Sequence, residues 1–179
     1  MNSKMIKSMK QWTGVFIAII SYYIIHEGTH LLLALLFGAF ERIRIVGIWG
    51  IQIVTDNGLD GIRLALFSGL SSIVTIVIGY ILAFSTFVYQ LKSRALLIAF
   101  YYITCCFMLL DPIYISVLSL FVGGGDLNGI TTGLQTSDIP FRIIFGSIAI
   151  LNIFLFQKKV SKQYKSIYNT QVNRHLLSR

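Results

Sequence analysis

Residues 23–36 read YIIHEGTHLLLALL, and they place two histidines and a glutamate inside a run of apolar side chains. The whole chain is similarly apolar: 55% of its 179 residues are hydrophobic, 12% are charged, and the mean hydropathy is +0.75. These values lie far outside the range of soluble domains. The sequence therefore predicts an integral membrane protein.

Four long apolar runs predict membrane-spanning helices, since a helix needs about 20 apolar residues to cross a bilayer. We expect the spans over residues 12–38, 64–89, 95–111 and 139–156. The third apolar run continues beyond Pro112 to Gly123. This continuation is either the same helix kinked at the proline or a separate short segment. The predicted fold class is therefore an all-α bundle of about four transmembrane helices.

A chain of this length has room for one bundle and no separate soluble domain. We expect one membrane domain over residues 1–157 and a basic C-terminal tail over residues 158–179, which is solvated or touches lipid headgroups. In a four-span arrangement, eleven of the fifteen Lys and Arg residues fall on the side that holds both termini. Because such residues are normally retained in the cytoplasm, both termini are predicted to be cytoplasmic. The compactness of the chain suggests a bacterial cytoplasmic membrane.

Two connections between the predicted spans are more than simple loops. Residues 43–55, IRIVGIWGIQIVT, are rich in β-branched side chains and carry Gly47 and Gly50. They predict a short strand or hairpin at the membrane surface. Residues 121–138, FVGGGDLNGITTGLQTSD, place Asp126 directly after three glycines, which stop a helix and allow close approach of the backbone.

The HEGTH motif at residues 26–30 has the spacing of a zinc-binding helix. Positions i and i+4 share one face of a helix, so His26 and His30 can direct imidazole nitrogens at one metal. Glu27 can then act as a general base on a water whose pKa zinc lowers to about 7. Ionisable residues are costly inside a membrane span and are usually functional. The motif therefore favours one zinc ion per chain over the alternative, a polar network between helices.

A catalytic zinc site of this kind needs a third protein ligand. His175 lies in the predicted tail, which leaves five carboxylates as candidates: Asp111, Asp126, Glu41, Asp56 and Asp60. Asp126 is favoured because it adjoins an apolar run that can return it to the bundle, and Asp111 is the second choice. Each has a structural alternative: Asp126 suits a helix N-cap, and Asp-Pro at 111–112 commonly begins a turn.

This arrangement resembles the site-2 protease family of intramembrane zinc metalloproteases. The shared features are HEGTH in the first span, a β-prone segment after it and an aspartate motif further on. Residues 66–80, LFSGLSSIVTIVIGY, also resemble the glycine-containing start of the helix that follows the strand segment in that family. The resemblance implies that His26, His30 and Asp126 bind zinc and that Glu27 is the base. It also implies that the substrates are membrane-spanning segments.

The resemblance is incomplete around the third ligand. The family usually has Asn-Pro some residues ahead of an Asp-Gly pair. Here GGGDLNG, residues 123–129, has no nearby proline, and Leu127 follows the aspartate. The sequence therefore indicates a small, divergent member.

Two further features bear on substrate binding. By the resemblance, the strand with Gly47 and Gly50 pairs with an extended substrate, and the alternative is a hairpin that only covers the bundle. Asn128 is a candidate donor to a substrate backbone or to the developing oxyanion, although asparagine is also an ordinary turn residue. The expected partners are a membrane protein or peptide substrate and the lipid bilayer, and no nucleic acid.

The predicted function is hydrolysis of peptide bonds in membrane-spanning or membrane-associated substrates. One alternative is a catalytically inactive zinc-binding membrane protein that acts as an interaction, immunity or chaperone factor. The presence of Glu27 argues against it, because zinc binding alone requires no base. A second alternative, a metal or ion transporter, predicts more polar groups than the second and fourth spans contain.

Overall fold

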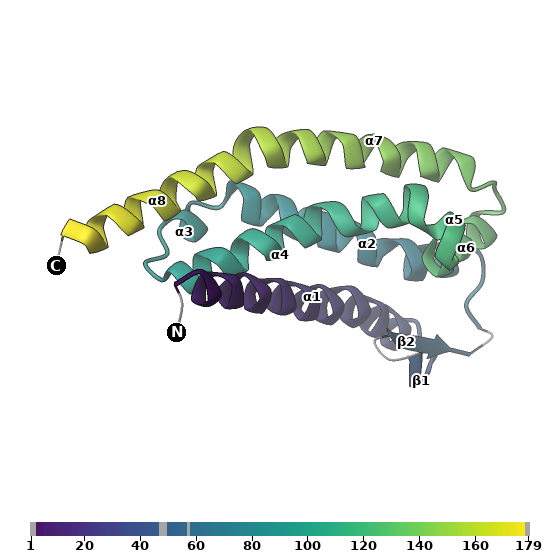
Figure 1. The fold of residues 1–179 in the computed structure, drawn as a ribbon. Coiled ribbons are helices and arrows are strands. Elements are labelled where there is room, and N and C mark those ends of the chain that lie inside the picture. The colour runs from purple at the N-terminus through teal and green to yellow at the C-terminus, as the bar shows by residue number, and fades with distance from the viewer. Residues whose placement is uncertain (1–2, 47–49, 57, 178–179) are drawn as a thin grey trace.

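The computed structural model describes residues 3–46, 50–56 and 58–177. Within them the chain forms a bundle of long helices with a two-stranded hairpin at one end (Figure 1). Four helical segments are long and apolar enough to cross a membrane: Gln11–Leu36, Gly61–Phe84, Arg94–Val122 and Ile139–Thr170. The prediction of a multi-pass helical membrane protein with a short β segment after the first helix is confirmed.

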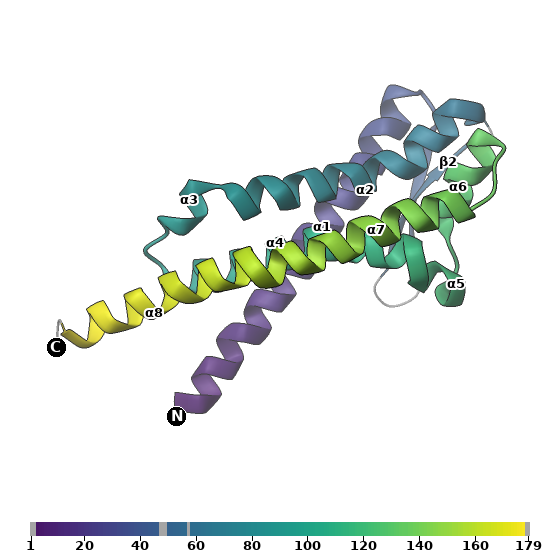
Figure 2. The ribbon, with the colours of Figure 1, turned by 90° about the horizontal axis from the view of Figure 1, so that it is seen from above.

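The bundle is built from long helices, most of which run back and forth along one direction, while the first is inclined to the others (Figure 2). In chain order the elements are α1 (Ser3–Leu36), β1 (Phe40–Val46), β2 (Gly50–Thr55), α2 (Gly61–Phe84), α3 (Thr86–Tyr89), α4 (Arg94–Ile113), η1 (Tyr114–Leu118), α5 (Ser119–Val122), α6 (Gly125–Leu134), α7 (Ile139–Leu155), η2 (Phe156–Val160) and α8 (Ser161–Leu177). The first turn of α1 and the last turn of α8 lie at one end of the bundle. The hairpin, α5 and α6 lie at the other end (Figure 1).

Helix α1 crosses α4 obliquely, and the two helices are in close contact (Figure 2). Gly14 lies at this crossing, where an added Cβ would lie 3.0 Å from side-chain atoms of both Ile98 and Tyr102. A larger residue at this position would separate the helices. The small residue therefore allows α1 to pack against α4, and this contact fixes how the rest of α1 faces the bundle.

The third span continues through Pro112 as one helical segment. Helix α4 leads directly into the π-helical turn η1 and then into α5. A proline inside a helix removes one backbone donor and crowds the preceding turn, and a wider turn can absorb the misfit. The Arg142 guanidinium of α7 donates to the carbonyls of Ile115 and Ser116 in this turn, at 3.4 and 3.3 Å. The alternative of a separate segment after Pro112 is therefore wrong.

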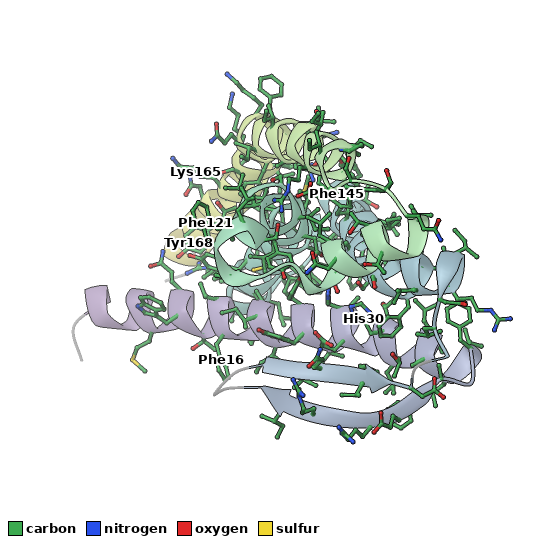
Figure 3. The ribbon with its side chains drawn as sticks, turned by 90° about the vertical axis from the view of Figure 1, so that its right-hand side faces the viewer. Phe16, His30, Phe121, Phe145, Lys165 and Tyr168 are labelled. Atoms are coloured by element: carbon green, nitrogen blue, oxygen red, sulfur yellow. The ribbon has the colours of Figure 1, made fainter. Side chains whose placement is uncertain are left out.

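The β segment predicted after the first span is an antiparallel hairpin. Ile43 pairs with Ile53 and Val46 pairs with Gly50, with an irregularity in register between Phe40 and Arg42. Strand β2 packs along α1 and buries Ile53 (Figure 3). Gly47, which was predicted to belong to this segment, lies outside the described residues.

The basic segment after the fourth span continues the same helix. Helix α7 passes through the π-helical turn η2 into α8, so the expected boundary between residues 157 and 158 falls inside a helical turn. Val160 and Tyr164 are buried, and the Tyr164 hydroxyl lies 3.2 Å from the Thr104 hydroxyl of α4. The first part of the predicted tail therefore packs on the bundle.

Candidate metal centre

Helix α1 carries the two motif histidines on one face, one turn apart. Their ring centroids are 5.0 Å apart, and the residues are only 6% and 5% exposed. Figure 3 shows His30 between α1 and the helices that pack above it. The helical spacing predicted for His26 and His30 is therefore the spacing observed.

Helix α6 brings Asp126 to these histidines. Gly123 ends α5 with a φ of +88°, a conformation that favours glycine, and α6 begins two residues later. Asp126 lies in the first turn of α6, where Gly124 and not Asp126 is the N-cap. Its Oδ2 lies 3.2 Å from His26 Nε2, and its Oδ1 lies 3.4 Å from His30 Nε2.

Close packing of α6 against α2 holds this position. An added Cβ at Gly133 would lie 2.5 Å from the carbonyl oxygen of Gly61 and 2.6 Å from the amide nitrogen of Ala65. No side chain fits into that space. The glycine therefore sets the distance between the two helices, and this distance places the first turn of α6 over α1.

The other ring nitrogens of the two histidines face oxygen atoms. His30 Nδ1 lies 2.8 Å from the backbone carbonyl of Phe67 in α2. His26 Nδ1 lies 3.3 Å from Asp111 Oδ1 and 3.2 Å from the Tyr22 hydroxyl. The Nε2 atoms of both rings are therefore directed at the same carboxylate.

His26, His30 and Asp126 fit a metal ion by the chemistry of their donor atoms. One ligand atom from each residue lies within 4.8 Å of the other two. Two imidazole nitrogens and one carboxylate oxygen are a donor set of catalytic zinc sites, in which a fourth position is kept for water or substrate. Two buried imidazoles and a partly buried carboxylate between helices otherwise carry a large cost.

The charge of Asp126 suits this role. Burial alone would raise the pKa of the Asp126 carboxyl, but the hydrogen bonds with His26 and His30 hold it below its ordinary value. The group is therefore an ionised carboxylate at neutral pH, which is the form that coordinates a cation.

Asp111, the second candidate for the third ligand, is fully buried inside α4. It lies on the Nδ1 side of His26, away from the ring atom that faces Asp126. The structural alternative for Asp111 is wrong, because Asp-Pro does not begin a turn here but continues a helix. Asp111 and Asp126 therefore flank one histidine from opposite sides.

Glu27 lies in a cleft of about 590 Å³ that contains the three ligand candidates. The residue is half-buried, on the same helix as the histidines. The cleft is bordered by α1, β2, α2, α4 and the start of α6, through residues that include Tyr22, Glu27, Gly50, Ile51, Gln52, Ile53, Phe67, Ser68 and Asp126. Gly50, one of the two predicted substrate-binding glycines, thus lines the cleft.

A second, apolar cavity of about 730 Å³ adjoins this cleft between α1 and the hairpin. Its lining includes Phe16, Ile20, Ile24 and Leu31 of α1, together with Ile43 and Ile51 of the hairpin. Glu27 and Ile53 border both cavities. The Glu27 side chain therefore lies where the apolar cavity meets the polar cleft.

The remaining candidates lie apart from the site. Asn128 is exposed and is not among the residues that line the cleft. Glu41 pairs with Arg42 on the hairpin surface, Asp56 accepts a hydrogen bond from the Gly58 amide, and Asp60 is the N-cap of α2. His175 belongs to α8, at the opposite end of the bundle (Figure 1).

Sequence reasoning missed Tyr22, Phe67 and Thr75, which contact the site residues. Tyr22 is one turn before His26, so helical periodicity could have found it. Thr75 of α2 contacts Asp111 of α4, and the Phe67 contact is made by a backbone carbonyl. These two contacts depend on how helices pack, and no local pattern signals them.

Comparisons of the chain with models of known protein families, with curated proteins and with solved structures gave no significant match.

Proposed function

We propose that this protein is an intramembrane zinc metallopeptidase that hydrolyses peptide bonds of membrane-spanning or membrane-associated substrates. The observation that carries the proposal is the convergence of His26 Nε2, His30 Nε2 and the Asp126 carboxylate beside Glu27 in one cleft of a membrane-embedded bundle. The resemblance of the HEGTH region to the site-2 protease family supports the same function.

His26, His30 and Asp126 would hold one zinc ion. When bound, zinc would activate a water molecule as nucleophile and polarise the scissile carbonyl. Buried imidazoles and a carboxylate within 4.8 Å of one another have no comparably simple use in a helix interface.

Glu27 is the general base in this proposal. It follows the first ligand directly on α1, so its carboxylate borders the cleft without belonging to the convergent donor set. There it would accept a proton from the attacking water and return it to the amine nitrogen of the leaving peptide. A protein that only binds zinc has no need of this carboxylate.

The substrate would enter from the lipid through the apolar cavity between α1 and the hairpin. This cavity is lined by aliphatic and aromatic side chains up to Glu27, where the polar cleft begins. Four consecutive residues of β2, 50–53, border the cleft. Because alternate strand residues point to opposite faces, a consecutive run indicates that the edge of the strand faces the cleft. That edge could pair with an extended substrate backbone.

The proposed setting is a bacterial cytoplasmic membrane with both termini in the cytoplasm. The orientation is supported by the basic residues near the end of the bundle that holds both termini. The catalytic cleft, near the hairpin, would then lie in the opposite half of the bilayer.

The test is the metal content of detergent-purified protein together with cleavage of a panel of single-span substrates. We expect about one zinc per chain in the parent and in Glu27→Gln, and loss of zinc in His26→Ala and Asp126→Ala. Cleavage should fall by at least about a hundredfold in all three variants. Glu41→Gln is the matched control, because Glu41 is exposed on the hairpin, where it pairs with Arg42.

Two results would count against the proposal in different ways. A parent without stoichiometric zinc after metal loading would mean that the cluster is a polar network. A parent that holds zinc while Glu27→Gln cleaves as well as Glu41→Gln would leave a metal-binding protein without the proposed chemistry.

A further inference from the structure

Asp111 is a fully buried carboxylate that the proposed zinc chemistry does not use. It lies in α4, within a segment long and apolar enough to cross the membrane, and its side chain is 0% exposed. An ionised group in such a place is expensive unless several hydrogen bonds satisfy it. The hydrogen bonds of Asp111 therefore indicate which groups stabilise its carboxylate inside the bundle.

Groups from two other helices meet at the Asp111 carboxylate. The Tyr22 hydroxyl of α1 donates a hydrogen bond to Oδ1 at 2.6 Å, and the Thr75 hydroxyl of α2 donates to Oδ2. His26 Nδ1 lies 3.3 Å from the same Oδ1. All four residues are buried or partly buried.

The hydrogen atoms in this cluster allow one simple assignment. Tyr22 has a single hydroxyl hydrogen, which it directs at Asp111. The tyrosine oxygen and the carboxylate both then face His26 Nδ1 as acceptors. A hydrogen on Nδ1 satisfies both acceptors. With Nδ1 protonated, a metal bound between Nε2 and the Asp126 carboxylate would receive the lone pair of Nε2.

We propose that Asp111, supported by Tyr22 and Thr75, is a positioning residue that fixes the orientation and tautomer of His26 so that Nε2 is presented to the metal. This inference rests on the proposed metal centre and adds a residue set to it. The second histidine is held in an equivalent way by a backbone carbonyl, that of Phe67, which no substitution of a side chain removes. Asp111 is thus the one of these two acceptors that mutation can change.

An outer carboxylate of this kind has a known scale of effect. Ligating histidines in metalloproteins commonly donate their second ring N–H to a carboxylate or carbonyl, and losing that partner lowers metal affinity about 10- to 100-fold. A carboxylate that only joined three helices would affect stability and leave the affinity of the folded protein unchanged. The two roles therefore differ in a measurable way.

The test uses Asp111→Asn and Thr75→Val in the full-length protein in detergent. Both replacements keep the size of the side chain, so the bundle should still form. Zinc and cobalt affinities are measured by competition with a chromogenic chelator, and the protonation of His26 Nδ1 is measured in metal-free protein by ¹⁵N NMR of labelled histidine. We expect affinity to fall about 10- to 100-fold in Asp111→Asn and less in Thr75→Val.

Asn152→Ala is the matched control. Asn152 of α7 is also 0% exposed, and it hydrogen-bonds to Tyr80 of α2 and to the Met108 carbonyl of α4. Its loss should destabilise the bundle through α2 and α4, which Asp111 also joins, and leave zinc affinity within twofold of the parent.

The outcomes separate this inference from the proposed function. If the parent binds zinc and Asp111→Asn binds it within twofold as tightly, the positioning role is wrong while the metal centre stands. Equal losses of affinity in Asp111→Asn and Asn152→Ala, or the absence of a proton on His26 Nδ1 in the parent, would also overturn the role. A parent that binds no metal would overturn both.

Discussion

His30 Nδ1 lies 2.8 Å from the backbone carbonyl oxygen of Phe67, and the imidazole ring of His30 contacts the phenyl ring of Phe67, with the ring centroids 4.8 Å apart. A carbonyl can only accept, so the imidazole donates through Nδ1 and its Nε2 is directed into the cleft. Helix α2 therefore orients a side chain of α1, and the proposed metal centre depends on the contact between these helices.

We expect His30→Ala to abolish stoichiometric zinc binding, because only one imidazole and one carboxylate would remain as protein ligands. The measurement is zinc per chain after metal loading and gel filtration. His175→Ala is the control, since His175 belongs to α8 at the far end of the bundle. Loss of zinc from His175→Ala with retention in His30→Ala would place the metal elsewhere.

Removal of zinc by a chelator should abolish cleavage but leave the helices intact. A cluster of buried apolar residues joins α2, α3, α4, η2 and α8. Its members are Ala83, Val88, Leu97, Met108, Phe156, Val160 and Tyr164. None of them is a proposed metal ligand. The bundle therefore has a core that needs no metal, unlike small domains that fold only around zinc.

Far-ultraviolet circular dichroism before and after chelation checks this expectation, and added zinc should restore cleavage. A large loss of helical signal on chelation would show that the metal is required for the fold itself.

The sequence predicted the helices and the hairpin because those features are local. Apolar runs long enough to cross a bilayer predicted the four spans, and β-branched residues between them predicted the strands. The HEGTH spacing likewise placed His26 and His30 on one face, since a helix has the same periodicity wherever it lies.

Features that depend on packing between distant segments could not be predicted in the same way. Nothing near Asp111 in the sequence indicates that Tyr22 and Thr75 approach it, because they are 89 and 36 residues away. The wide turn after Pro112 was not predicted either, since both a kinked helix and a break satisfy the same sequence.

Gly133→Ala should destabilise the protein and weaken its metal centre together. The added methyl group would lie 2.5 Å from the Gly61 carbonyl and 2.6 Å from the Ala65 amide, so α6 must move away from α2. Overpacking of this kind typically costs about 1–3 kcal/mol. Because α6 carries Asp126, zinc affinity should fall as well.

Gly146→Ala in α7 is the control, since its added methyl group would make only an ordinary contact with Ser116, at 3.5 Å. This change should be neutral or slightly stabilising, because alanine favours a helix by about 1 kcal/mol over glycine. Melting temperature in detergent and zinc affinity are measured for both variants. Equal melting temperatures for the two variants would contradict the close packing of α6 on α2.

The pair formed by Asp138 and Arg142 at the start of α7 should make a pH-dependent contribution to stability. The Arg142 side chain donates to Asp138 Oδ2 at 2.6 Å, and this hydrogen bond holds the pKa of the Asp138 carboxyl below its ordinary value. A carboxyl whose pKa is lower in the folded state stabilises that state above the unfolded-state pKa, about 3.9. The contribution is lost as the pH falls through the folded-state pKa.

Asp138→Asn should therefore melt at a lower temperature than the parent at pH 7, and the difference should shrink towards zero as the pH is lowered below about 4. The comparison of the two proteins cancels the titration of carboxyls that they share. The effect should be small, because Asp138 is exposed and such pairs are worth little in water. A difference that stays constant from pH 7 to pH 3 would mean that the substitution acts through the geometry of the helix start and not through the charge of Asp138.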